Sequence, residues 1–265
     1  MAIKILLDPG HYYGVNAMPN GYCEGTQMWK LYTFLRPMLE AYGFTVGTTR
    51  YSTKEYPKDG KGNDFIEGRG RMSKGYDIML SLHTNACNTE SVNRPVVIYP
   101  ISGKGKDLAD KLGAALQACM GLQKFQTYSQ KNSSGTADYY GVIRGAAAVG
   151  VPALIVEHTF HTNNKMALWL KSDANLQKVA QCVADTVAKH YGYTKKEDVT
   201  DMTKEELEKL IDERVKKILA GEGSEASAWA KKELEEAKAN GITDGTRPLG
   251  YATRQEVACM VVRSL

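Results

Sequence analysis

The sequence contains no long hydrophobic run. A membrane-spanning helix needs roughly 20 consecutive apolar residues, and no segment of this chain comes near that length. The short apolar run at the amino terminus also lacks the length and the small-residue cleavage site of a secretory signal. We therefore expect no membrane partner and no signal peptide.

Cysteine is sparse in this sequence. The five cysteines are scattered and odd in number, which argues against a disulfide framework and favours a reducing compartment. Because no C-x-x-C pair occurs, a zinc knuckle built from cysteines is excluded. Lysine and arginine form no stripe with interleaved aromatic residues, so we expect no nucleic-acid partner.

The net charge of +4 is the sum over two parts of the chain that have opposite net charge. From Thr194 onward, 13 Lys and Arg residues stand against 15 Asp and Glu, which leaves a net charge of −2 there and +6 in residues 1–193. A basic front part suits an anionic polymer such as the bacterial cell wall. At 265 residues, the chain is long enough for one large domain and one small one.

Three short apolar runs end at side chains that can bind a metal or move a proton. Residues 3–7 lead through Asp8, Pro9 and Gly10 to His11, residues 78–82 lead to His83, and residues 153–156 lead to Glu157 and His158. The runs are too short for helices, so they indicate buried strands. In open α/β sheets, ligands bind at the carboxyl ends of the strands.

The polar groups after these strands suit a metal centre. Glu24, in the loop after the first strand, adds another carboxylate. Two imidazoles and one carboxylate make a zinc site with an open position for water, and a further carboxylate can act as a base. A single His or Glu is more often a surface residue, so this interpretation depends on the repeated placement of such groups after buried strands.

The remaining front part alternates between strands and helices, which favours an α/β layered domain. Helical periodicity is clearest at residues 26–42 and 106–120. Further helices are expected at 64–73, 165–170 and 176–190, further strands at 44–46 and 96–99, and a polar loop at 127–139.

The tail predicts a charged linker and helix over residues 194–223, followed by a small all-α region over 224–265. Residues 203–220 open with a Thr-x-x-Glu capping box and carry one apolar stripe. This helix either pairs with a second copy of the chain, giving a homo-oligomer, or docks on its own domain. Met202, at the boundary, is a candidate second translation start.

Several motifs of residues 1–193 resemble the zinc-dependent N-acetylmuramoyl-L-alanine amidases, which are cell-wall hydrolases of bacteria and phages. They are Leu-Leu-Asp-Pro-Gly-His at 6–11, Leu-Ser-Leu-His-Thr-Asn-Ala at 80–86, and Val-Glu at 156–157 with Phe160 and Asn163. The resemblance implies a mixed, mostly parallel central sheet flanked by helices. It also implies one Zn²⁺ held by His11, Glu24 and His83, with Glu157 as the catalytic carboxylate.

The same resemblance implies a phage-type endolysin or related autolysin that cleaves the amide between N-acetylmuramic acid and L-alanine. Such an enzyme would lie in the host cytoplasm before lysis and act on peptidoglycan. Two alternatives stay open: another zinc hydrolase of the wall, such as a stem peptidase, and a non-catalytic wall-binding protein with a structural metal. Other divalent ions also suit a site of two His and one Glu.

Some residues depart from that family's pattern. His158 and His161 stand where the family usually has small or apolar residues. Strand alternation is expected to point His158 away from Glu157, whereas His161 either contacts substrate or has a structural role, which we favour. Arg69 and Arg71 either brace the metal-site loops or bind a carboxylate, with ordinary ion pairing as the default.

The end of the chain resembles a single S-layer-homology-like repeat. The resemblance lies in Trp229, Gly241, Gly245 and residues 253–257. It implies binding of a secondary wall polymer. Because such repeats usually occur in threes, self-association through residues 203–220 would restore several copies and raise avidity.

Overall fold

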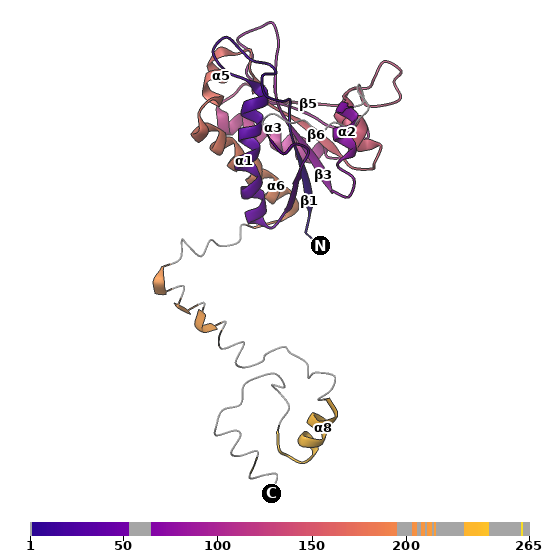
Figure 1. Cartoon of the computed structure of the whole chain (residues 1–265), viewed down its shortest axis with the longest axis vertical. Coiled ribbons are helices and arrows are strands. Elements are labelled where there is room, and N and C mark those ends of the chain that lie inside the picture. The colour runs from indigo at the N-terminus through magenta and orange to yellow at the C-terminus, as the bar shows by residue number, and fades with distance from the viewer. Residues whose placement is uncertain are drawn as a thin grey trace. The chain divides into compact units, whose positions relative to one another are not determined.

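The computed structural model describes residues 2–52, 65–194, 203–205, 208–209, 211–213, 215, 231–243 and 261 (Figure 1). The chain forms two compact units, Met1–Lys196 and Glu197–Leu265. Within the described ranges, no helix has both the length and the apolar character needed to cross a bilayer. Four of the five cysteines fall in these ranges, and all four are free thiols.

The front unit alternates strands with helices, as predicted. Its strands are β1 (Lys4–Pro9), β2 (Thr45–Thr48), β3 (Ile78–Asn85), β4 (Val96–Ile98), β5 (Gln126–Tyr128) and β6 (Ala153–Phe160). Its helices are α1 (Glu24–Tyr42), α2 (Phe65–Arg71), α3 (Lys106–Met120), α4 (Gly141–Ala147), α5 (Asn164–Leu170) and α6 (Asp173–Tyr191).

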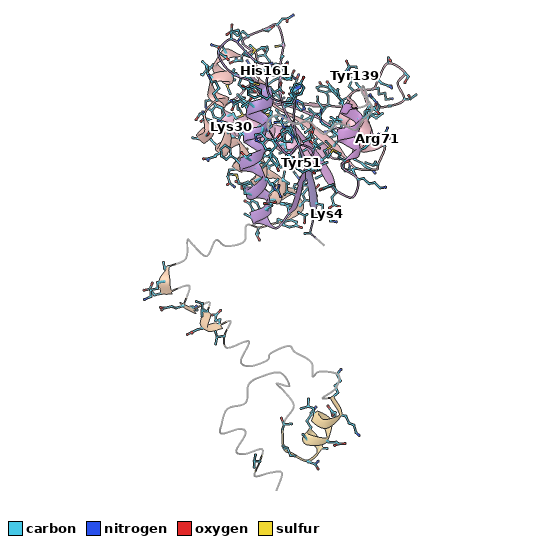
Figure 2. All side chains as sticks on the ribbon, in the orientation of Figure 1. Lys4, Lys30, Tyr51, Arg71, Tyr139 and His161 are labelled. Atoms are coloured by element: carbon cyan, nitrogen blue, oxygen red, sulfur yellow. The ribbon has the colours of Figure 1, made fainter. Side chains whose placement is uncertain are left out.

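The strands form one mixed, mostly parallel sheet in the order β2-β1-β3-β6-β4-β5, which confirms the predicted fold class. β2, β1, β3 and β6 are mutually parallel, whereas β4 runs antiparallel to β6. The carboxyl ends of β1, β3 and β6 therefore lie at one edge of the sheet. Figure 2 shows this polarity: Lys4 begins β1 at one end, and His161 follows β6 at the other.

Side chains alternate between two hydrophobic cores because successive strand residues point to opposite faces. Ile5 and Leu7 of β1 join the larger core with α1, α3 and α6. Leu6 joins the smaller core with Val142 and Ile143 of α4. Figure 1 shows α1 and α2 on opposite sides of the strands. The sheet is thus covered on both faces, as parallel sheets require.

Helices α2 and α4 pack together through glycines. A Cβ added at Gly145 would lie 2.0 Å from the Glu67 carbonyl oxygen, and one at Gly70 would lie 2.1 Å from the Val142 carbonyl oxygen. Only glycine permits such close backbone contact. This contact fixes the helix that carries Arg69.

Arg69 forms a buried ion pair with Asp8 near the end of β1. Its Nε lies 2.9 Å from Asp8 Oδ1 and its Nη2 lies 3.0 Å from Oδ2. The hydroxyls of Ser81 and Thr49 also donate to this carboxylate. Burial alone would raise the pKa of Asp8, but the Arg69 charge and these hydrogen bonds lower it to about 2. The interaction joins β1 to β3 and α2, three residues before His11 in the chain.

Several element boundaries differ from the sequence prediction, and three of them bear on the site or on the loops around it. Helix α1 begins at Glu24, so this residue lies in the first helical turn and not in the preceding loop. Strand β6 continues through Phe160, beyond the apolar run of residues 153–156 from which it was predicted, because its pairing with β3 extends as far as Asn85. The three-residue strand β5 lies at the start of the polar segment that was predicted as a loop.

The described part of the second unit is helical. Residues 204–205, 208–209, 211–213 and 215 have helical conformation, with Ile211 and Val215 exposed. α8 (Lys231–Ala239) confirms a helix before Gly241, which has a φ of 66°. Trp229 and residues 244–265 of the predicted all-α region, apart from Val261, lie outside the described residues. The domain boundaries, the wall-binding repeat and self-association remain predictions.

Asp8→Asn is expected to destabilise the fold strongly, because it leaves the Arg69 guanidinium buried without its counter-charge. We expect a loss of about 3–5 kcal/mol in the free energy of unfolding, measured by urea denaturation. The matched control is Glu40→Gln, which breaks the exposed pair with Arg36 and should cost less than about 1 kcal/mol. Equal effects for the two variants would contradict this role of Asp8.

The Asp8 pair also predicts a pH dependence of stability. Because the pKa of Asp8 falls from 3.8 to about 2 on folding, its stabilising contribution is present above pH 4. It is lost as the pH falls through about 2, and amounts to about 2 kcal/mol. Urea unfolding between pH 5 and pH 2 should show this loss in the wild type and less of it in Asp8→Asn.

Candidate metal centre

His11 is presented by a tight turn at the end of β1. Its φ of 57° lies in the left-handed region, which few residues other than glycine adopt. The preceding Gly10 donates its backbone N–H to the Leu82 carbonyl oxygen at 2.9 Å. A Cβ at Gly10 would lie 2.4 Å from His83 Cε1. The absence of a side chain at residue 10 thus allows the two histidines to approach one another.

Glu24 is fully buried at the start of α1, where a carboxylate is favoured by the helix dipole. Its Oε1 accepts a hydrogen bond from the Thr84 backbone N–H at 2.8 Å, and its Oε2 accepts one from Asn16 Nδ2 at 2.6 Å. The next residue, Gly25, packs against the Tyr12 carbonyl oxygen, which lies 2.0 Å from where a Cβ would be. These contacts fix the direction of the carboxylate.

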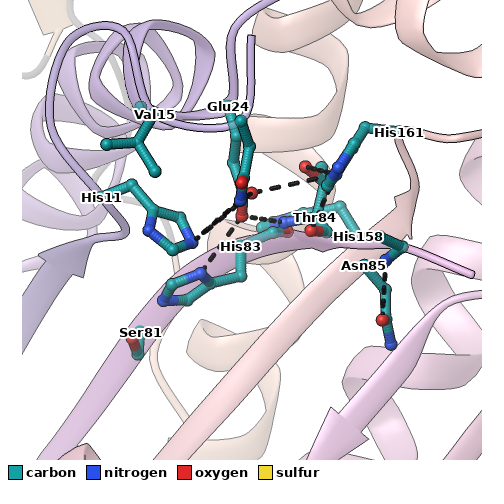
Figure 3. A network of polar contacts seen from close by, with 12 residues as sticks. His11, Val15, Glu24, Ser81, His83, Thr84, Asn85, His158 and His161 are labelled. Carbon is teal, nitrogen blue, oxygen red and sulfur yellow. Dashed lines mark hydrogen bonds and ion pairs between the residues drawn. The ribbon is translucent and has the colours of Figure 1, made fainter. Parts of the chain in front are cut away.

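The structure brings His11, Glu24 and His83 together (Figure 3). His11 Nε2 lies 3.5 Å from Glu24 Oε2, and His83 Nδ1 lies 3.1 Å from Glu24 Oε1. One donor atom from each residue lies within 4.8 Å of the others. Zn²⁺ binds such N and O donors at about 2.0–2.2 Å, so the group fits a zinc ion with little rearrangement.

The protonation states of Glu24 and His11 favour a cation. Burial would raise the pKa of Glu24, but hydrogen bonding to His83 and the histidine charges lower it to about 2. Burial and the His83 charge lower the pKa of His11 to about 4. Glu24 is therefore ionised and His11 neutral at pH 7. Metal ligands must be deprotonated in this way before they bind an ion. Burial would lower the pKa of His83, but the hydrogen bond to Glu24 and the nearby carboxylate charges outweigh it and raise this pKa, so an ion must displace a proton from this ring.

Glu157 lies beside this group on β6. It is paired in register with His83 of β3, and its Oε2 is buried with no hydrogen-bond partner in the described part of the chain. Burial and the Glu24 charge raise the pKa of Glu157 to about 7, although the His83 charge opposes them. A carboxyl with a pKa near neutrality can accept and release a proton under ordinary conditions.

The other residues considered from sequence have structural contacts. Arg69 forms an ion pair with Asp8, and Arg71 forms one with Glu67. Ordinary ion pairing was the default prediction for both arginines. His161 is buried, with its Nδ1 3.1 Å from the Thr84 carbonyl oxygen. His158 is fully buried, and burial lowers its pKa to about 4.

Sequence reasoning missed Asn16 and Thr84, which both hydrogen-bond Glu24. Thr84 directly follows His83 in a motif that the sequence analysis used, so its position was a usable signal. Its contribution, however, comes from the backbone N–H, which every residue other than proline carries. Asn16 has a φ of 53°, a conformation that asparagine tolerates better than most residues.

Gly10→Ala is expected to weaken metal binding, because the added methyl group would push the His83 ring from its place. We expect at least about a tenfold rise in the Zn²⁺ dissociation constant, measured by competition with a chelating indicator. Gly135→Ala is the control for general backbone strain, since residue 135 has a φ of 73° but no described atom within 4 Å of its Cβ position. Unchanged affinity in Gly10→Ala would contradict the close packing described above.

Comparison with known proteins places this geometry in context. The sequence profile of the N-acetylmuramoyl-L-alanine amidase family matches residues 5–189. Among curated proteins, none matches the chain.

Solved structures share the fold of the front unit. The catalytic domain of CwlV, an N-acetylmuramoyl-L-alanine amidase from Bacillus (Paenibacillus) polymyxa var. colistinus, aligns with a TM-score of 0.58 at 18% identity, covering 72% of this chain and 99% of that one. The amidase Ami1 from Mycobacterium abscessus aligns with a TM-score of 0.58 at 19% identity, covering 72% and 100%.

Cwp6 from Clostridium difficile has a TM-score of 0.61 at 19% identity, and the match covers 71% of this chain but 29% of Cwp6. Because the family profile covers well over half of the sequence, including the three converging side chains and Glu157, the chain belongs to the N-acetylmuramoyl-L-alanine amidase family.

Proposed function

We propose that this protein is a zinc-dependent peptidoglycan hydrolase that cleaves the amide between N-acetylmuramic acid and L-alanine. The observation that carries the proposal is the convergence of His11, Glu24 and His83 at the sheet edge, with Glu157 next to His83. Family membership supplies the bond that is cleaved. His11, Glu24 and His83 would hold the ion, and Glu157 would be the catalytic carboxylate.

The donor set supports zinc as the resident ion. Two imidazoles and one carboxylate leave a coordination position free for water, as in catalytic zinc sites. When bound, zinc lowers the pKa of a water ligand from about 16 to about 7 and polarises a carbonyl oxygen. The hydrogen bonds from Thr84 and Asn16 keep the Glu24 carboxylate oriented toward the two histidines.

Glu157 moves the proton in this proposal. Its Oε2, which has no hydrogen-bond partner among the residues that the structure describes, accepts the proton of the attacking water. It then donates this proton to the nitrogen of L-alanine as the amide C–N bond breaks, so that the products are a free muramic-acid carboxyl group and a free amine. Without an ion, burial and the Glu24 charge raise the pKa of Glu157 to about 7, and a general acid–base group works best when its pKa lies near the operating pH.

The finer biological role is also part of the proposal. We infer an endolysin or autolysin that accumulates in the host cytoplasm and binds a secondary wall polymer through its tail. Fractionation of a producing host should find the full-length chain in the cytoplasmic fraction until the membrane is permeabilised. Export with a cleaved amino terminus would contradict this localisation without affecting the proposed chemistry.

Glu157→Gln is expected to abolish hydrolysis while leaving metal binding intact, because the amide can neither accept nor deliver the proton. We expect kcat to fall at least about 10²–10⁴-fold. The assay digests purified peptidoglycan and counts new L-alanine amino termini against new reducing sugar ends. Removal of the metal by a chelator should abolish the same product, and added Zn²⁺ should restore it.

The matched control is Glu90→Gln, since Glu90 is exposed and makes no side-chain contact with the metal centre. New termini within the peptide stem would replace the amidase assignment by a stem peptidase. The absence of any cleavage by metal-loaded wild type on a range of walls would favour a non-catalytic wall-binding protein.

A further inference from the structure

The pairing of β3 with β6 is irregular beside the metal centre. His83 pairs with Glu157 and Asn85 pairs with Phe160, so one residue of β3 lies opposite two residues of β6. Such a bulge interrupts the backbone ladder and leaves main-chain groups in need of other partners. The interruption falls at Thr84, between a candidate ligand and the end of the strand. The two residues of β6 opposite Thr84 are His158 and Thr159.

His158 forms a hydrogen bond with the backbone of the candidate ligand residue His83. Its Nδ1 lies 2.9 Å from the His83 carbonyl oxygen (Figure 3). A carbonyl oxygen can only accept, so Nδ1 carries the proton and donates. The contact fixes the backbone from which the His83 ring extends. The side chain is fully buried, so water does not compete for the bond.

His161 makes a corresponding contact with the next residue of β3. Its Nδ1 lies 3.1 Å from the Thr84 carbonyl oxygen and 3.1 Å from Thr84 Oγ1. Tyr22 stacks on the His161 ring, and its hydroxyl lies 2.7 Å from Thr84 Oγ1. The Thr84 backbone N–H that donates to Glu24 belongs to the same peptide unit as the His83 carbonyl that His158 binds. His161 holds the next peptide unit and the Thr84 side chain, and its Nδ1 lies 3.8 Å from Glu24 Oε2.

We propose that His158 and His161 are positioning residues that hold the His83–Thr84 segment at the bulge and thereby tighten metal binding by His83 and Glu24. This inference rests on the metal site of the proposed function. Neither histidine is a ligand in this proposal: among the described residues, only His11, Glu24 and His83 form a group able to hold an ion.

The buried nitrogen of His158 argues against simple core filling. Its Nε2 is buried with no hydrogen-bond partner in the described ranges, which is unfavourable for a polar atom. A leucine would fill the same place without that penalty. The hydrogen bond from Nδ1 to the His83 carbonyl oxygen therefore explains why residue 158 is a histidine.

The experiment uses the full-length chain. It compares His158→Leu, His158→Asn and His158→Gln, together with His161→Leu and His161→Asn. Asn Nδ2 can replace Nδ1 as a donor, Gln places its donor one bond farther out, and Leu has none. The Zn²⁺ dissociation constant is measured with a competing indicator, and the Co²⁺ absorption spectrum reports ligand geometry. His190→Leu on α6 is the matched control, since His190 pairs with Asp107.

We expect His158→Leu and His161→Leu to raise the Zn²⁺ dissociation constant by about 10- to 100-fold, as for other groups that orient metal ligands. The Asn variants should stay within about threefold of wild type, and the Co²⁺ spectrum should change only in the Leu variants. If the Leu variants do not fold, the comparison of His158→Asn with His158→Gln decides, and Asn should bind at least about tenfold more tightly.

Wild-type affinity in folded Leu variants, or equal affinity for Asn and Gln at residue 158, would overturn the positioning role and leave the proposed function intact. If the wild type itself binds no Zn²⁺, both the metal site and this inference are wrong. A loss of activity in the Leu variants with unchanged metal affinity would also overturn the positioning role, because the two histidines would then act on substrate or on Glu157.

Discussion

The buried carboxylate of Asp8 joins the segments that deliver the metal centre. It accepts hydrogen bonds from Arg69 on α2, from Ser81 on β3 and from Thr49 after β2. β1 leads from Asp8 to His11 within three residues, and β3 leads from Ser81 to His83 within two. A charge buried this deeply is tolerated only with such partners, so the network specifies how these strands align at the edge where the histidines meet.

Two carboxyl groups near one another have opposite electrostatic environments. Glu24 receives hydrogen bonds and histidine charge, so its pKa is about 2 and it remains an anion. Glu157 is buried, and its Oε2 has no hydrogen-bond partner in the described ranges, so burial raises its pKa to about 7. Environments that separate the pKa values of neighbouring carboxyl groups are how sites assign them different roles. Here they distinguish an anion suited to a cation from a group suited to proton transfer.

The sequence was informative where local pattern determines structure. Short apolar runs followed by His11, His83 and Glu157 correctly predicted strands whose ends converge, because parallel strands place their carboxyl ends at one edge. The start of α1 was predicted two residues late, since Cys23 precedes Glu24 where a typical capping side chain would mark the boundary.

The β6 bulge could not be predicted, because it depends on how residues 157–160 pair with a strand more than 70 positions earlier. For the same reason, the roles of His158 and of the Thr84 backbone N–H were not visible from sequence. The buried pair of Asp8 and Arg69 likewise joins elements far apart in the chain. The sequence contained Arg69 as a candidate, but its partner became apparent only when α2 was packed on the sheet.

The position of Glu24 on the first turn of α1 has a consequence for chain stability. His11 and Glu24 bracket residues 12–23, and in the proposed site an ion bound to both would close this segment into a loop, as a covalent cross-link does. The loop contains the exposed Tyr12 and Tyr13. Occupancy of the site would then govern how readily a protease cuts the chain between β1 and α1, so the lifetime of the protein in the presence of proteases would depend on metal supply.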